Sequence, residues 1–70
     1  MERIPVRSTT FSSVGYDRQT SVLELEFASG SIYQYAGVSH ETFEEFMAAP
    51  SQGAFFNKNI AKVYSCKRVG

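Results

Sequence analysis

The last twenty residues of the chain contain the side chains best suited to bind an anion. Three Lys and one Arg stand in residues 51–70 without a single Asp or Glu. If a helix continues from Gly53 to about Tyr64, Lys58 and Lys62 lie one turn apart on it. Ammonium and guanidinium groups neutralise phosphates, and an aromatic ring beside them can stack on a base. The predicted nucleic-acid-binding residues are Phe55, Lys58, Asn59, Lys62, Lys67 and Arg68.

The distribution of charge allows a second, structural interpretation of this basic end. The chain has no net charge and an isoelectric point near 6.5, whereas strong nucleic-acid binders usually lie above about 9. Residues 21–50 carry five Glu and no Lys or Arg. The basic end can therefore complement the acidic middle, within one chain or between two copies, and lysines late in a helix also favour its negative end. Both interpretations stay open at this point.

Catalytic and metal-binding chemistry has little support in the residue types. The chain has one His, His40, and one Cys, Cys66, which cannot build a four-ligand zinc site in a single chain. It has no glycine-rich phosphate loop, no acidic pair with metal spacing and no nucleophile elbow. We expect His40 on the surface at a helix start and Cys66 as a reduced thiol in a frayed C-terminal region. The prediction is a protein that is not an enzyme, with no metal and no cofactor.

The length and composition limit the chain to one small domain. It has 70 residues, 43% of them apolar, with six Phe and four Tyr. A core of this size usually supplies only about 3–5 kcal/mol of stability. No apolar run approaches the roughly 18 residues that a membrane helix needs, and the start lacks a signal peptide, so we expect a cytoplasmic protein. Residues 1–9 read as a flexible N-terminal arm, and residues 10–70 as a single domain.

Three short segments have the patterns of β-strands. Residues 22–27 are the clearest, because apolar and acidic side chains alternate there with the period of two that is typical of a half-buried strand. Residues 11–17 precede them and residues 31–36 follow them, with short polar connections between. Such connections permit hairpins but no crossover helix. We therefore predict a three-stranded antiparallel meander.

Two helices are predicted after the strands. Ser39 is suited to cap the first, and Pro50 ends it. Ser51 can cap the second, in which apolar residues recur at helical spacing as far as Tyr64. The fold class is α+β, a three-stranded antiparallel β-meander followed by two α-helices packed on one face, in the order β-β-β-α-α. The predicted core residues are Leu23, Leu25, Phe27, Tyr33, Tyr35, Phe43, Phe46, Phe56, Ile60 and Tyr64.

The length of one hairpin loop decides where Tyr33 and Tyr35 point. If residues 28–30 form a three-residue loop, Leu25 lies opposite Tyr33 and both tyrosines face the helices. With a loop of two or four residues, the tyrosines share the open face of the sheet with two glutamates, which repel a phosphate backbone. We favour the three-residue loop, because Gly30 at its third position suits the positive φ that this loop requires. The tyrosine pair is then structural.

A series of short motifs runs from Thr10 to Tyr64. The motifs are Ser12-Ser13 with Val14-Gly15-Tyr16-Asp17, Leu23-x-Leu25-x-Phe27, Tyr33-Gln34-Tyr35, Val38, and Ala49-Pro50-Ser51-x-Gly53-x-Phe55-Phe56-Asn57 with Ile60 and Tyr64. In this order they resemble the KTSC domain, a short module found alone in bacterial and phage proteins and at the C-terminus of some lysyl-tRNA synthetases. The resemblance implies a module of unknown function, for which RNA binding has been suggested.

Self-association is the alternative function. A three-stranded meander leaves two sheet edges with unpaired backbone groups, which a second copy could cover. A homodimer could pair these edges, or it could exchange a terminal element through the hinge at residues 49–53. The predicted partners are therefore RNA or a second copy of the chain, with no membrane and no small-molecule cofactor. We predict a non-catalytic binding module of one of these two kinds.

Overall fold

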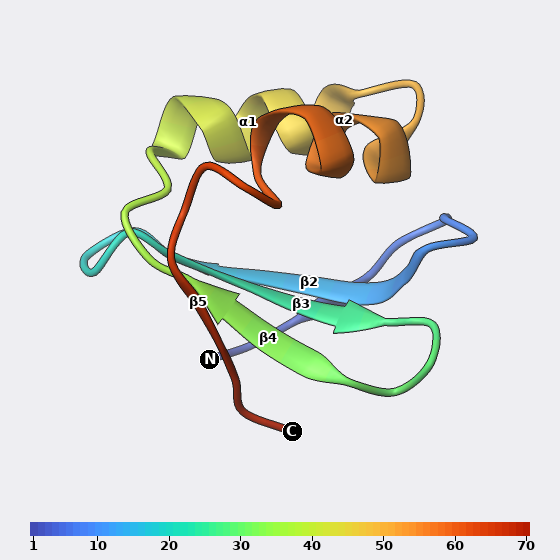
Figure 1. The fold of residues 1–70 in the computed structure, drawn as a ribbon, viewed down its shortest axis with the longest axis horizontal. Helices are drawn as coiled ribbons and strands as arrows, with labels where there is room; N and C mark the ends of the chain where they lie inside the picture. The colour runs from blue at the N-terminus through green and yellow to red at the C-terminus, as the bar shows by residue number, and fades with distance from the viewer.

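The structure, a computed structural model, describes residues 1–70 and consists of one sheet with two helices on one of its faces (Figure 1). The sheet has five antiparallel strands in the order β1-β2-β3-β4-β5. The elements are β1 (Ile4–Pro5), β2 (Phe11–Asp17), β3 (Val22–Phe27), β4 (Ile32–Tyr35), α1 (His40–Ala48), α2 (Gln52–Asn59) and β5 (Cys66–Arg68). The predicted α+β class is confirmed, with both helices in a layer of their own.

The β3–β4 hairpin has the predicted register. Leu25 lies opposite Tyr33, and the backbone N–H of Phe27 donates to the carbonyl oxygen of Ser31 at 2.9 Å. Gly30 has a φ of +98°, a value that a residue with a Cβ rarely adopts. The three-residue loop therefore turns both tyrosines of β4 toward the helices, and the residues between them toward the open face.

The predicted number of strands is wrong, since the sheet has five strands and not three. Ile4 of β1 pairs with Val14 of β2, and Cys66 of β5 pairs with Tyr35 of β4. Strands of two and three residues are too short to show a period of two, and β5 contains no alternation of apolar and polar side chains. Their pairing joins distant parts of the chain, so no local pattern could indicate it. Cys66 therefore lies in a paired strand and not in a frayed tail.

This pairing changes the argument for a homodimer. The predicted edges, β2 and β4, are both covered within the same chain by β1 and β5. The outer edges of the real sheet are short, and each carries residues that discourage further pairing. Pro5 in β1 has no backbone N–H, and β5 contains Lys67 and Arg68. The homodimer stays a prediction, but the meander edges that motivated it are paired within the chain.

The helices begin where their capping residues predict. The hydroxyl oxygen of Ser39 accepts from the backbone N–H of Thr42 at 3.1 Å, and α1 ends two residues before Pro50. Ser51 caps α2 in the same way, but α2 ends at Asn59, so the prediction of a helix to Tyr64 is too long. Residues 60–64 form turns, because the chain must return to the sheet to pair as β5. Neither helix is long and apolar enough to cross a membrane.

The core lies between the sheet and the two helices, and Phe56 of α2 contacts three of its aromatic rings. Its ring is in edge-on contact with Phe11, Phe27 and Tyr35, with centroids 5.3 to 5.6 Å apart. Of the ten predicted core residues, six are buried and Phe27, Tyr33, Phe43 and Tyr64 are half-buried against them. The prediction omitted three buried hydrophobic residues: Phe11, Val14 and Val38. The first two are inward positions of β2, whose pattern is broken by a bulge between residues 11 and 13.

Candidate functional site

The four cations of the C-terminal part are all exposed, and we call them the basic surface: Lys58, Lys62, Lys67 and Arg68. They come from the end of α2, the turns that follow it, and β5. None of them pairs with an Asp or Glu side chain, whereas Arg3 pairs with Glu24. Arg68 Nε donates a hydrogen bond to the oxygen of Gly70 at 2.9 Å. The three lysines of the basic surface therefore carry positive charge that no acidic side chain of the chain neutralises.

Strand β5 separates the two cations that it contains. Side chains alternate along a strand, and residues directly opposite on neighbouring strands share a face. Arg68 lies opposite Tyr33, so it belongs to the face that the helices cover. Lys67 lies opposite Gln34, so it belongs to the open face. The predicted cationic cluster is thus divided between the two faces of an edge strand, and a bound chain would have to follow that edge to meet both cations.

Phe55 and Asn59 have contacts within the helical layer. The ring of Phe55 is half-buried and lies 6.0 Å from that of Phe46 in α1, at an angle of 60°. The side-chain amide of Asn59 donates to the carbonyl oxygen of Phe55 at 3.3 Å. Because Phe55 packs between α1 and α2, only part of its ring is available to stack on a base. The exposed members of the predicted set are the four cations.

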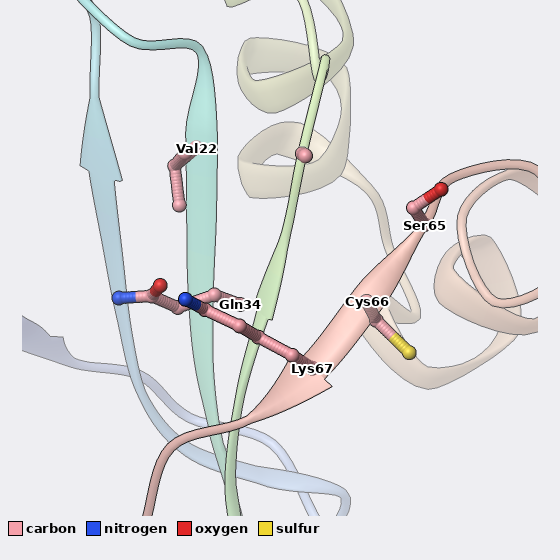
Figure 2. Close-up of a pocket in the computed structure, with 6 residues that line it drawn as sticks. Val22, Gln34, Ser65, Cys66 and Lys67 are labelled. Atoms are coloured by element: carbon pink, nitrogen blue, oxygen red, sulfur yellow. The ribbon is translucent and has the colours of Figure 1, made fainter.

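A pocket of about 370 Å³ opens on the face of the sheet that the helices leave free. It lies where β3, β4 and β5 run side by side, and we call it the open-face pocket. Figure 2 shows Gln34 and Lys67 extending to the same side of the strands, while the sulfur of Cys66 points away from both. The pocket therefore presents an amide and an ammonium group, and not the thiol. Its lining residues are Val22, Gln34, Ala36, Ser65, Cys66 and Lys67.

A row of polar side chains crosses the open face beside this pocket. Arg3 Nε lies 3.4 Å from Glu24 Oε2, and the other carboxylate oxygen of Glu24 accepts from Gln34 Nε2 at 2.8 Å. Gln34 in turn lies opposite Lys67. Arg3 and Gln34 therefore hold the Glu24 carboxylate from both sides, and the carboxylate in turn fixes the position of the Gln34 amide. The sequence prediction missed this row, although the predicted hairpin register already puts Glu24 opposite Gln34. No pattern in the neighbouring sequence indicates that Arg3 lies beside Glu24.

The two tyrosines of β4 belong to the core side of the sheet. Tyr35 is only 4% exposed, and Tyr33 is half-buried with its ring edge-on to Phe27 at 5.7 Å. Burial, and to a lesser extent the neighbouring Cys66 and Tyr33, raise the pKa of Tyr35 from 10.0 to about 12. Neither ring offers an open platform for a base, so a nucleic-acid interface would have to lie elsewhere.

His40 and Cys66 lie in different parts of the fold. His40 is the first residue of α1, where its Nδ1 lies 3.4 Å from Glu44 Oε1 and its ring lies 6.0 Å from that of Tyr16. It lines a second pocket, of about 300 Å³, whereas Cys66 lines the open-face pocket. No three of the His, Cys, Asp and Glu side chains gather where they could share a metal ion. The structure does not bring these two residues together as a pair.

Comparison with known proteins identifies the module. A family model described as the KTSC domain matches residues 7–64, which confirms the resemblance that the sequence motifs predict. A crystal structure of a KTSC domain protein from Yersinia pestis superimposes with a TM-score of 0.95 at 38% sequence identity. The match covers 99% of this chain and 97% of that one. The two chains therefore share the fold over almost their whole length.

The matching proteins are of two kinds. An uncharacterized protein from Stutzerimonas stutzeri (strain A1501) is 38% identical over 58 residues, which cover 83% of this chain and 82% of that protein. A lysine–tRNA ligase from Nostoc punctiforme is 44% identical over 45 residues, which cover 64% of this chain but only 8% of the ligase. The module thus occurs both as most of a small protein and as a minor part of a much larger one.

Proposed function

Because the chain belongs to the KTSC domain family, whose function is unknown, we propose that it is a non-catalytic module that binds single-stranded RNA along β5. The observation that carries the proposal is the basic surface. Its four cations are exposed, have no Asp or Glu partner, and follow one another along the chain from α2 into the edge strand. Charge of this kind is free to replace the counterions of a phosphate backbone.

The edge position of β5 explains why a single strand is the proposed ligand. Lys67 and Arg68 extend to opposite faces of the sheet, so a backbone that runs along the edge passes between them. A flexible single strand can follow such an edge, and its phosphates can meet Lys58 and Lys62 on the helical side. The match to lysine–tRNA ligases adds support, because those enzymes act on an RNA and contain a copy of this module.

The expected affinity is weak and depends on salt. Four cations neutralise at most four phosphates, and each contact to single-stranded nucleic acid contributes a slope of about −0.7 to the dependence of log K on log salt concentration. The half-buried ring of Phe55 leaves little stacking to add to this. The module would therefore act as an accessory domain that adds to the affinity of a larger assembly for RNA.

The test is charge reversal with a matched control. A labelled RNA of roughly ten nucleotides is titrated with the protein at about 50 mM salt. The Lys58→Glu, Lys62→Glu double variant should lose most of the binding. The Arg7→Glu, Arg18→Glu variant changes the net charge by the same amount at two exposed positions outside the basic surface, so it should bind nearly as well as the original chain.

Two outcomes would overturn the proposal. One is the absence of saturable binding by the original chain at low salt. The other is an equal loss in both variants, which would mean that net charge and not the basic surface governs the interaction. Circular dichroism of each variant checks that the fold is intact, and all four substituted side chains are exposed, so we expect no change in it.

A further inference from the structure

We propose that the open-face pocket binds one base of the RNA through an exocyclic amino group, which gives the module a preference for cytidine or adenosine over uridine. This inference rests on the proposed function, because it concerns the same RNA at the point where its backbone passes Lys67. Three properties of the pocket support it: the fixed orientation of an amide, the cation beside that amide, and the apolar residues in the lining.

The amide of Gln34 can have only one orientation. An ionised carboxylate accepts hydrogen bonds and donates none, so the group that Gln34 presents to Glu24 must be its NH₂, at 2.8 Å. The carbonyl oxygen Oε1 then faces away from Glu24. Because the same carboxylate also pairs with Arg3, at 3.4 Å, it is held in place from the far side. The pocket therefore offers a hydrogen-bond acceptor whose direction is fixed before any ligand binds.

Lys67 adds a positive charge to the same pocket. It extends over the open face on the same side as Gln34 (Figure 2) and has no ion-pair partner. The lining residues Val22 and Ala36 contribute apolar surface at the other end. An acceptor, a cation and an apolar area match a ligand with a donor group, a neighbouring anion and a flat apolar ring. A nucleotide has all three features.

The volume and the chemistry together select the class of base. A pocket of about 370 Å³ lies in the range of small-molecule sites, so it can hold a base that has left the stack. Cytosine has an amino group at N4 and adenine has one at N6, and either can donate to Gln34 Oε1. In the same pose, uracil places its O4 carbonyl oxygen against Gln34 Oε1. Two acceptors facing each other leave the amide unpaired.

The experiment compares two RNA oligomers of equal length, one of cytidine and one of uridine, so that their backbones carry the same charge. We expect the original chain to bind the cytidine oligomer about fivefold more tightly, the effect of one hydrogen bond. Gln34→Ala should reduce this ratio to about one while it retains the binding that depends on the cations. Gln19→Ala is the matched control, because Gln19 is exposed in the β2–β3 turn and should leave the ratio unchanged.

The outcomes separate this inference from the proposed function. Equal binding of both oligomers by the original chain, or a cytidine preference that survives Gln34→Ala, would overturn the base pocket and leave RNA binding intact. No binding of either oligomer would overturn both. Competition with cytidine 5′-monophosphate distinguishes a free nucleotide from a base within a strand. If the mononucleotide displaces the labelled oligomer at concentrations similar to those of unlabelled oligomer, the pocket is a site for a free nucleotide. If much higher concentrations are needed, the pocket is a site for a base within a strand.

Discussion

Arg3 and Glu24 meet on the open face of the sheet, with Nε and Oε2 3.4 Å apart, although they come from distant parts of the chain. The contact is possible because Gly15 lies opposite Glu24 in β2 and has no side chain. The N-terminal residues pass closely over this glycine. A single absent Cβ thus allows the start of the chain to lie against the sheet and to orient the carboxylate that holds Gln34.

Gly15→Ala should therefore destabilise the protein. A Cβ at this position would lie 2.7 Å from the backbone oxygen of Glu2 and 2.8 Å from the side chain of Arg3. We expect a loss of about 1–3 kcal/mol in the free energy of unfolding, measured by urea denaturation, because the backbone and β1 must shift. Gly70→Ala is the control, since its Cβ would meet side-chain atoms of Ile32 and no backbone, with Cδ1 the nearest at 2.9 Å. Equal small losses in both variants would contradict the role of Gly15.

Phe56→Ala should unfold most of the protein. The Phe56 ring is in contact with three aromatic rings that come from β2, β3 and β4. Removal of a buried Phe side chain costs about 3–5 kcal/mol, which is comparable with the entire stability of about 3–5 kcal/mol that a core of this size supplies. A loss of chemical-shift dispersion among the amide signals in NMR spectra would show this unfolding. Val63→Ala, at a side chain that is 63% exposed, should change stability by less than about 0.5 kcal/mol.

Stability should fall in alkaline solution as the pH rises from 10 toward 12. The pKa of Tyr35 is raised from 10.0 to about 12, chiefly by burial, so the folded state keeps a proton that the unfolded state releases. Below pH 10 both states are protonated and Tyr35 has no effect; above it, deprotonation favours the unfolded state. Tyr35→Phe should remove this part of the pH dependence in denaturant titrations, whereas Tyr64→Phe should keep it. An unchanged pH profile in Tyr35→Phe would contradict the assignment.

The protein should be a monomer. Its outer edges, β1 and β5, are two and three residues long, and the cations of β5 would repel a second copy of the same strand. Sedimentation at high micromolar concentration should give the mass of one chain, 7.8 kDa. A mass that doubles with increasing concentration would support the homodimer that the sequence prediction left open, and it would require an interface other than the predicted meander edges.

The part of the fold that depends on local patterns was predictable. The period of two in β3, the capping residues Ser39 and Ser51, and Gly30 in its loop each act within a few residues, and the structure has all of them. The two short edge strands were not predictable, because their hydrogen bonds join the ends of the chain to the meander. The predicted length of α2 was wrong for the same reason. Apolar residues continue at helical spacing past Asn59, but the chain must turn there because β5 pairs with β4.

The candidate site was predictable only in part. Charge in the last twenty residues indicated the basic surface, and the four cations are exposed. The sequence could not show that Lys67 and Arg68 lie on opposite faces, because this follows from β5, which was not predicted. It also could not show the open-face pocket, since its lining combines residues of β3 and β4 with the C-terminal segment that was expected to fray.

The most direct test of the account is the salt dependence of RNA binding by the original chain. The affinity for a labelled single-stranded RNA is measured between about 50 mM and about 200 mM salt, and log K is plotted against log salt concentration. Contact of the four cations of the basic surface with phosphates predicts a slope near −3, which the Lys58→Glu, Lys62→Glu variant should reduce by about half or more. A slope near zero, or no saturable binding at the lowest salt concentration, would contradict the proposal that this module binds RNA through its basic surface.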